Sequence, residues 1–152
     1  MTRRLLFPLL VASCVPYDVV VKGEGVGAED SDPTDCTGDM VECCRVLSAD
    51  LARDPSEAEA LLTAFPQIDT PDHPPPVDLS GVDWATRSLV AVYTAGICPS
   101  TGYQLHVGRL SPDGDNLVIH GHVSDAGRGD DVTTRPFELL LANWTGTTVE
   151  AR

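Results

Sequence analysis

The sequence has few basic residues and no apolar run long enough to cross a bilayer. Among 152 residues, 10 Lys and Arg stand against 23 Asp and Glu, which gives a net charge of -13. A chain with this balance is repelled by the phosphates of nucleic acids and by anionic lipid headgroups. We therefore expect no nucleic-acid partner, and no contact of the folded part with a membrane surface.

The sequence also lacks the usual signatures of catalysis and of zinc binding. Ser100 is not set in a Gly-x-Ser-x-Gly elbow, and the spacing of Cys36, Cys43 and Cys44 matches no common zinc ligand pattern. Cys98 is the one candidate nucleophile, but an exported chain with several cysteines favours a disulfide there. These patterns predict that the protein is not an enzyme and carries no cofactor.

The N-terminus has the anatomy of an export signal. Arg3 and Arg4 precede an apolar stretch, Leu5 to Ala12, that is too short to span a membrane as a mature helix. The order Val11-Ala12-Ser13-Cys14 resembles the bacterial lipobox, which implies a signal peptide over residues 1–13 and lipidation of Cys14. The lipid would then be the only membrane anchor, and Val15 in place of an aspartate favours the outer membrane of the cell envelope.

Four cysteines remain if Cys14 is lipidated, and an even number in an exported protein predicts two disulfides. Cys43 and Cys44 are neighbours, and a bond between them would need a strained ring. We therefore expect one of the two to pair with Cys98 and the other with Cys36. The sequence leaves open which one does which.

The chain divides into an N-terminal tether and one domain. Residues 14–39 are rich in Gly, Asp and Glu, so beyond the lipidated cysteine they are expected to form a flexible acidic tether. The domain spans residues 40–152, and its first element is predicted as a short strand over Val41 to Leu47 that carries the cysteine pair.

A helix is expected to follow. Asp54-Pro55-Ser56-Glu57 combines a cap, a first-turn proline and a capping-box glutamate. Apolar residues then fall on one helical face until Pro66 ends the helix, so the helix should cover a sheet. These residues are Ala58, Leu61, Leu62 and Phe65.

The rest of the chain alternates as strands do. Strands are predicted over Leu89 to Ala95, Tyr103 to Leu110, Asn116 to Val123 and Phe137 to Trp144. The expected fold is mainly β: a small antiparallel, sandwich-like domain with one covering N-terminal helix.

Three histidines are predicted to share the face of the sheet that points away from the core. A five-residue loop over Ser111 to Asp115 would place His106 opposite His120, and a three-residue loop would place it opposite His122. A metal could use that geometry, so a metal-binding envelope protein is one alternative function. Otherwise these histidines are solvent-facing polar residues.

The segment CPSTGY, Cys98 to Tyr103, is the candidate contact site. Proline fixes one turn dihedral, Gly102 can adopt a positive φ, and Tyr103 can plug the following strand into the core. A loop stapled at Cys98 loses little entropy on binding, which suits a protein-contact surface. The predicted contact residues are Pro99, Ser100, Thr101, Gly102 and Tyr103. The alternative is a turn needed only for folding.

A set of short motifs runs from the aspartate and aromatic residue before the first of these strands, through a glycine and a Pro-x-x-Gly-Tyr turn, to a Thr-x-x-Pro-aromatic closing strand. The residues are Asp83, Trp84, Gly96, Pro99, Gly102, Tyr103, Thr133, Pro136 and Phe137. With this pattern, residues 82–141 resemble the C-terminal domain of the PrcB family, named for a lipoprotein subunit of a bacterial protease complex. The resemblance implies a protein that binds another protein and stabilises or modulates a secreted protease complex. The sequence departs from the family at Cys98 and at Ser100-Thr101.

A weaker resemblance points to chagasin-type cysteine-protease inhibitors. Pro99 to Tyr103 and Arg135 to Glu138 are similar to the motifs of two of their binding loops. Those inhibitors need a longer insert between the two motifs than this chain has. The similarity of the two motifs nevertheless makes a cysteine-protease inhibitor the second alternative function.

Overall fold

The structure, a computed structural model, describes residues 14–26, 39–64, 78–100, 102–125 and 134–152. The predicted signal peptide, residues 1–13, lies outside this part. No helix among the described residues has the length and apolar character needed to span a membrane. The elements are β1 (Tyr17–Val26), α1 (Met40–Arg45), β2 (Leu47–Ala52), α2 (Pro55–Ala64), β3 (Ser88–Thr94), β4 (Tyr103–Asp113), β5 (Asn116–Asp125), β6 (Thr134–Ala142) and β7 (Thr148–Ala151).

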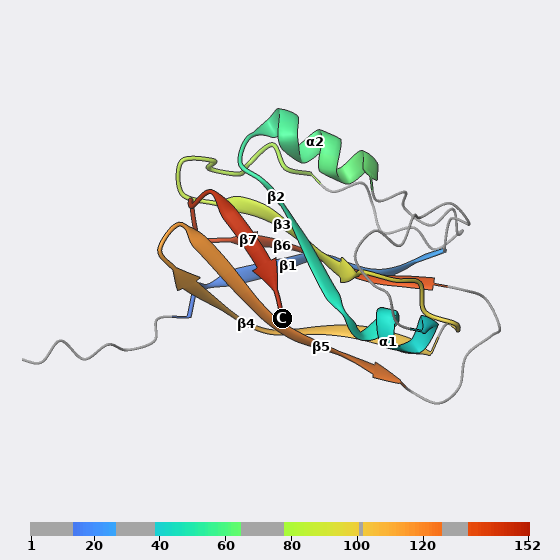
Figure 1. Cartoon of the computed structure of the whole chain (residues 1–152). Helices are drawn as coiled ribbons and strands as arrows, with labels where there is room; N and C mark the ends of the chain where they lie inside the picture. Colours follow the sequence, from blue (N-terminus) through green and yellow to red (C-terminus); the bar gives the residue numbers. More distant parts are fainter. Residues whose placement is uncertain (1–13, 27–38, 65–77, 101, 126–133) are drawn as a thin grey trace, which may run out of the picture.

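Two sheets form the domain (Figure 1). The first has four strands in the order β1-β6-β3-β2, all antiparallel. The second has three strands in the order β4-β5-β7, in which β7 runs parallel to β5. The prediction of a small, mainly β domain is confirmed, and all described strand pairs are antiparallel except β5 with β7, a strand that was not predicted.

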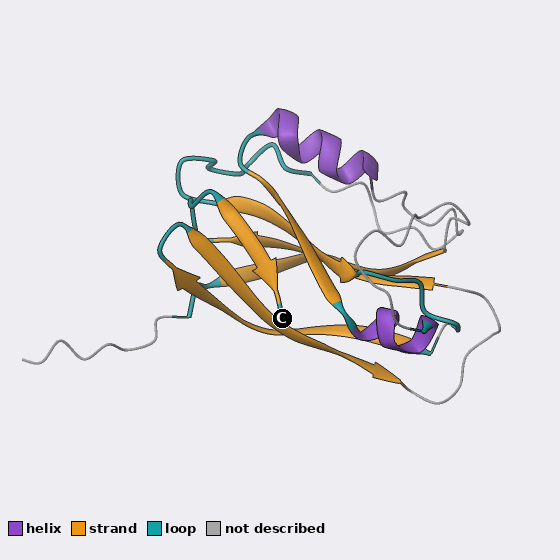
Figure 2. Ribbon diagram, in the orientation of Figure 1, coloured by secondary structure: helices purple, strands orange, loops and turns teal. Residues whose placement is uncertain are grey.

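The four-stranded sheet is buried on both faces, so the described residues contain two apolar layers. Alternate residues of one strand serve different layers, as the period of a strand requires: Leu140 of β6 faces the three-stranded sheet, and Leu139 and Leu141 face α2. Helix α2 covers the sheet with Ala58 and Leu61, which confirms the predicted lid (Figure 2). The hydrogen bond from Glu57 N–H to the Asp54 carboxylate confirms its predicted cap.

The predicted tether is wrong for residues Tyr17–Val26, which form β1 along the edge of the four-stranded sheet. Tyr17 packs in the layer between the two sheets, whereas Val21 packs in the layer under α2, because a register shift lies between Val19 and Val21. No single alternation runs through the strand, and the period-two signal is therefore lost. The rest of the predicted tether, residues 27–38, lies outside the described residues.

The predicted strand over Val41 to Leu47 is also wrong. Residues Met40–Arg45 form helix α1, and β2 begins only at Leu47. The Asp39 carboxylate accepts a hydrogen bond from the Glu42 N–H at 2.9 Å and so satisfies one free donor of the first turn. This cap outweighs the strand preference of the valine at position 41.

The hairpin between β4 and β5 has neither of the predicted loop lengths. Asp113 pairs with Asn116, so the turn holds only Gly114 and Asp115, and Gly114 has a φ of 60°. A β-bulge then shifts the register between Val107 and Arg109. The extra residue, Gly108, restores the pairing that a three-residue loop would have given.

Candidate protein-contact loop

The predicted contact segment, residues 98–103, connects the two sheets and is called the contact loop below. It leaves β3 of the four-stranded sheet and enters β4 of the three-stranded sheet. The structure describes all of it except Thr101. Because the contact loop links β3 to β4, its two ends are positioned by different sheets.

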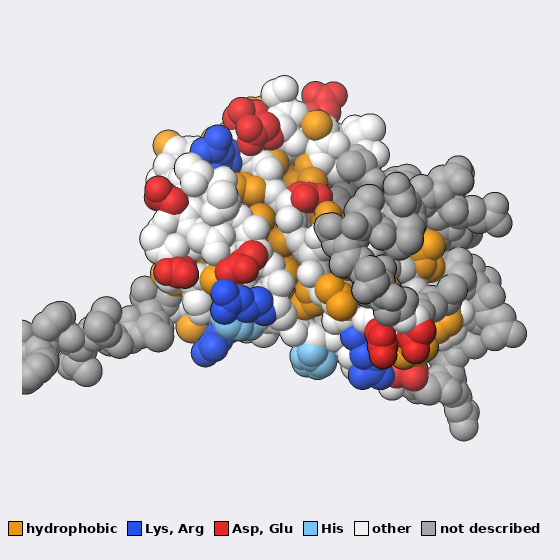
Figure 3. All heavy atoms as spheres, in the orientation of Figure 1, with side chains coloured by type: hydrophobic (Ala, Val, Ile, Leu, Met, Phe, Trp, Pro, Cys, Tyr) orange, Lys and Arg blue, Asp and Glu red, His pale blue; other side chains and the backbone are white. Residues whose placement is uncertain are grey.

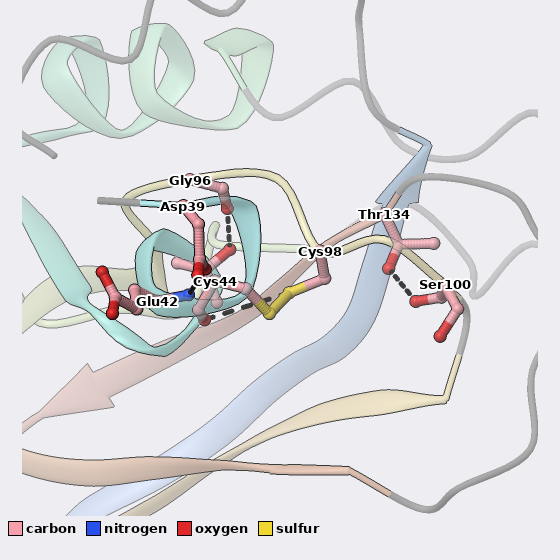
Figure 4. Close-up of a disulfide and its surroundings, with 8 residues drawn as sticks. Asp39, Glu42, Cys44, Gly96, Cys98, Ser100 and Thr134 are labelled. Carbon is pink, nitrogen blue, oxygen red and sulfur yellow. Dashed lines mark hydrogen bonds between the residues drawn. A yellow bond between two sulfur atoms is a disulfide. The ribbon is translucent and has the colours of Figure 1, made fainter. Parts of the chain in front are cut away.

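A disulfide fixes the first residue of the contact loop. Cys98 is bonded to Cys44 of α1 with 4.8 Å between the Cα atoms, and neither side chain is exposed (Figure 4). This confirms that one of the two neighbouring cysteines reaches Cys98. Cys43 is also disulfide-bonded, and its predicted partner, Cys36, lies outside the described residues. Cys14, the predicted lipidation site, is an exposed free thiol.

Close packing at Gly96 holds α1 against the chain that leads into the loop. The Gly96 N–H donates to the Cys43 carbonyl at 3.0 Å. A Cβ atom at Gly96 would lie only 2.4 Å from the Cβ atom of Cys43. No larger residue fits here, so this glycine of the family pattern has a structural reason in the present chain.

Thr134 holds the other side of the contact loop. Its backbone exchanges two hydrogen bonds with Cys98, at 2.7 and 2.9 Å. Its hydroxyl donates to the Ser100 carbonyl at 2.9 Å (Figure 4). Thr134 is 3% exposed, so solvent competes little with these bonds. The loop is therefore tied by one covalent bond and three hydrogen bonds before any partner arrives.

The residues of the contact loop differ in what they offer to a partner. Tyr103 is 7% exposed and belongs to the core between the sheets, as its predicted plugging role requires. Gly102 is buried as well. Pro99 and Ser100 are half-buried. Among the described residues of the loop, the surface open to another protein is therefore made by Pro99 and Ser100.

The three histidines lie on the predicted face of the sheet, but the described residues do not gather all three at one point. His106 pairs with His122, and their rings stack with centroids 5.1 Å apart, whereas His120 lies opposite Arg109. Among the described residues, no group of three His, Cys, Asp or Glu is placed to hold a metal ion. Histidine side chains show at the surface along β5 (Figure 3). The geometry favours the solvent-facing reading.

His106 and Ser124 lie in contact like a base and its nucleophile, with His106 Nε2 and Ser124 Oγ 2.8 Å apart. The other ring nitrogen, Nδ1, lies 3.4 Å from the Lys22 ammonium. An ammonium can only donate, so Nδ1 accepts and the neutral ring carries its proton on Nε2. Nε2 then donates to Ser124 and cannot take its proton, which is the wrong tautomer for general-base catalysis.

The sequence interpretation missed a polar seam where β4 meets β1 and β6. The Val107 N–H donates to the Glu138 carboxylate at 3.3 Å, and the Tyr17 hydroxyl donates to the Val107 carbonyl at 3.2 Å. The side chains of Glu138 and Tyr17, both from the four-stranded sheet, thus bind the N–H and the C=O of Val107 in β4. The available signal was Glu138 itself, a lone charge within an apolar strand, since such residues are rarely buried without a partner.

The electrostatics of the seam follow from its burial. Glu138 is 4% exposed, and burial raises the pKa of its carboxyl above the ordinary value, while Lys22 and the Val107 N–H partly oppose the shift. Burial and the Glu138 charge raise the pKa of Tyr17. Burial, then the positive charges of Lys22 and His122, lower the pKa of His106. Lys22 therefore favours an ionised Glu138 and a neutral His106.

Comparison with family models, with curated proteins and with solved structures finds no match to this chain. The resemblance to the PrcB family therefore remains a prediction from short motifs. The structure does bear on the second resemblance. Arg135 to Glu138 lie within strand β6, where Pro136, Phe137 and Glu138 are buried. These residues do not form an open loop of the kind that the inhibitor resemblance requires.

Proposed function

We propose that this chain is an exported lipoprotein whose β domain binds another protein through the contact loop and thereby stabilises or modulates a secreted protease complex. The observation that carries the proposal is the fixation of the loop by the disulfide and by Thr134. A loop that is already ordered loses little conformational entropy on binding. Pro99 and Ser100 remain available at its surface.

The position of Cys14 supports this role if the residue carries lipid. Val15 is 8% exposed, and its N–H donates to the Leu110 carbonyl of β4 at 2.8 Å. The anchor would therefore join the domain directly, beside Leu110. The contact loop lies seven residues away along β4, or about 20 Å at the rise of a strand. The anchor end would face the membrane, and the loop would point away from it toward a partner.

A binding comparison tests the proposal. The bait is the chain beginning at Val15, because this start keeps all of β1. The wild type is compared with Ser100→Arg and with the matched control Asp113→Arg, which places the same charge at the far end of β4. We expect the wild type and the control to recover the same secreted protease or protease-complex subunit from envelope and secreted fractions, and Ser100→Arg to recover at least about tenfold less.

Two results would sink parts of this proposal. Equal recovery by Ser100→Arg and the wild type, with both folded by circular dichroism, removes the contact loop as the site. A partner unrelated to proteolysis removes the protease role and leaves a protein-binding domain. Inhibition of papain by the same fragment would instead favour the chagasin-type alternative.

Membrane attachment is tested separately with the full chain. We expect Cys14→Ser to abolish incorporation of labelled fatty acid and to release the protein from the membrane fraction. The fold should be unchanged because Cys14 has no disulfide partner. Ser13→Ala keeps the small residue of the motif and serves as the control. Retention of label by Cys14→Ser would exclude lipidation at this cysteine.

A further inference from the structure

Strands β1 and β4 run side by side across the gap between the sheets but are joined at one end only. Residue numbers rise along β1 as they fall along β4: Val15 contacts Leu110, Tyr17 contacts Val107, and Lys22 contacts His106. The strands are therefore antiparallel. A backbone hydrogen bond joins the first pair of residues, but only side chains join the later ones. Figure 1 shows β1 and β4 diverging from the end where β1 begins.

The free edge of β4 faces this gap. The Val107 N–H and C=O both bind side chains of the four-stranded sheet, so the edge-facing backbone groups of β4 belong to Val107 and to every second residue from it. Leu105 is the next such residue, and it pairs with Val123 in the same register. Among the described strands, only β5 pairs with this part of β4. The N–H and C=O of Leu105 thus point into the gap, and no strand of the described residues pairs with them there.

A hollow lies at this place, called the edge cleft below. It has a volume of about 320 Å³, which is at the small end of ligand sites and suits one or two side chains. Lys22, the only lysine of the sequence, is exposed at this cleft. The lining residues are Lys22, Gly23, Gln104, Leu105, Pro136 and Phe137.

We propose that the edge cleft binds an extended segment of the protein partner, which adds to the free edge of β4 at Leu105 and places an acidic side chain beside Lys22. Unpaired backbone donors and acceptors select an extended polypeptide, because a strand supplies both at the matching spacing. Lys22 is the one charged side chain among the described residues that line the cleft, and its positive charge selects a negative one. The bonded backbone of Val107 ends the free edge in one direction, and the contact loop lies in the other.

This inference deepens the proposed function and rests on it for the identity of the partner. The segment that enters the edge cleft would continue directly past Tyr103 to the contact loop. The edge cleft and the contact loop would then bind one continuous stretch of the partner. The main-chain bonds would give affinity, and Lys22 would give selectivity.

The test uses the chain beginning at Val15, labelled with ¹⁵N, and a defined probe: a short peptide of alternating threonine and valine with a central glutamate. Two matched peptides serve as controls, one with alternate N-methyl groups that block main-chain pairing and one with lysine in place of the glutamate. We expect the probe to shift the amide signals of Leu105 and Gly23 with a Kd of about 1 mM or tighter. N-methylation should abolish the shifts, and the lysine peptide should bind about two- to fivefold more weakly.

Protein variants complete the test. Lys22→Glu should weaken the glutamate peptide and strengthen the lysine peptide, whereas Arg152→Glu, which makes the same charge change at the C-terminus, should leave both unchanged. Equal binding of the N-methylated peptide, or no shift at Leu105 at the highest peptide concentration, would overturn the inference. A concentration-dependent dimer that protects the Leu105 amide would overturn it too, because the edge would then belong to a second copy.

The inference and the proposed function can fail separately. Loss of partner recovery in Ser100→Arg, with no peptide at Leu105, leaves the contact loop and removes the edge cleft. Peptide binding at Leu105, with partner recovery unaffected by Ser100→Arg, leaves the edge cleft and removes the loop.

Discussion

The start of β4 and its middle are held in place by different means. At Tyr103 the strand emerges from a loop fixed by the Cys44–Cys98 disulfide and by the backbone of Thr134. Toward its middle, at Val107, the same strand is held to the opposite sheet only by the side chains of Glu138 and Tyr17. The first arrangement keeps one shape, and the second can open without breaking a covalent bond or a strand ladder.

The difference indicates what the contact loop and the edge cleft would each contribute to binding. A rigid loop contributes pre-organisation, since little of its freedom is lost on contact. An open strand edge contributes main-chain N–H and C=O groups that can form hydrogen bonds with an added segment. Changes at the fixed end should therefore alter stability strongly, and changes at the seam should alter it weakly and in a pH-dependent way.

Removal of the disulfide should have the largest effect. The double variant Cys44→Ala, Cys98→Ala opens a covalent loop between residues 54 apart in sequence, and chain entropy predicts a loss of about 4 kcal/mol in the free energy of unfolding. Urea denaturation under oxidising conditions measures it, with Cys14→Ser as the neutral control. A loss below about 1 kcal/mol would show that Thr134 alone fixes the loop.

Gly96→Ala should have the next largest effect. The new Cβ atom would lie 2.4 Å from the Cβ atom of Cys43, so α1 must move, and overpacking of this kind costs about 1–3 kcal/mol. The matched control is Gly81→Ala, where a Cβ atom meets nothing within 4 Å. Thermal unfolding compares the two. Equal melting temperatures would mean that α1 does not pack as described.

Glu138→Gln should stabilise the protein at neutral pH by about 1 kcal/mol, because the amide oxygen still accepts from Val107 while the buried charge is gone. The pKa of Glu138 is raised in the folded state. Its favourable contribution is therefore fully present below the unfolded pKa and is lost as pH rises through the folded pKa. The difference in unfolding free energy between variant and wild type should therefore grow as pH rises from the unfolded to the folded pKa of Glu138, and it should vanish in acid.

Unfolding curves at several pH values measure this gap. Glu138→Leu is the control, since it removes the charge and also leaves the Val107 N–H without an acceptor, which should destabilise the protein at every pH. A glutamine variant that is less stable than the wild type at neutral pH would mean that Lys22 more than offsets the burial of the charge.

Lys22→Gln should have the smallest effect and should act on ionisation. Removal of the ammonium beside Nδ1 raises the pKa of His106, because one of the positive charges that lowers it is gone. Imidazole signals followed by NMR during a pH titration report the change. Arg109→Gln, which lies opposite His120, should leave the His106 titration in place. An unchanged His106 pKa in Lys22→Gln would show that burial and His122 set it without Lys22.

Much of the fold could be predicted from the sequence wherever a local pattern is complete. The cap at Asp54 with its capping-box glutamate located α2, and the alternation of the later strands located β4 and β5. The four strands and the helix predicted there are all present. In each case the periodicity and the boundary signals agree, which is when sequence patterns are most informative.

Two of the misses occurred where one extra residue interrupts a pattern. The bulge at Gly108 set the histidine pairing, and the register shift beside Val19 concealed β1. Strand β7 was also missed, because its four residues are too short for a period-two signal and it pairs in parallel with β5. A bulge depends on the partner strand, and the sequence of one strand alone does not show it.

The sequence indicated a fixed turn at residues 98–103, but not the long-range contacts that hold it. The proline, glycine and cysteine of the contact loop marked a fixed turn. The contribution of Thr134, 36 residues beyond Cys98 in the chain, depends on how the two sheets meet and has no local sequence signal. The edge cleft depends on the same long-range arrangement.

The most direct test of the contact loop is site-specific crosslinking from the chain beginning at Val15 in native envelope and secreted fractions. A photoreactive residue replaces Ser100 in one version and Asp113, at the far end of β4, in the other. The account predicts a specific crosslinked protein from position 100, absent from position 113, and identified by mass spectrometry as a secreted protease or a subunit of its complex. Identical products from both positions, or none from position 100 in a folded protein, would contradict it.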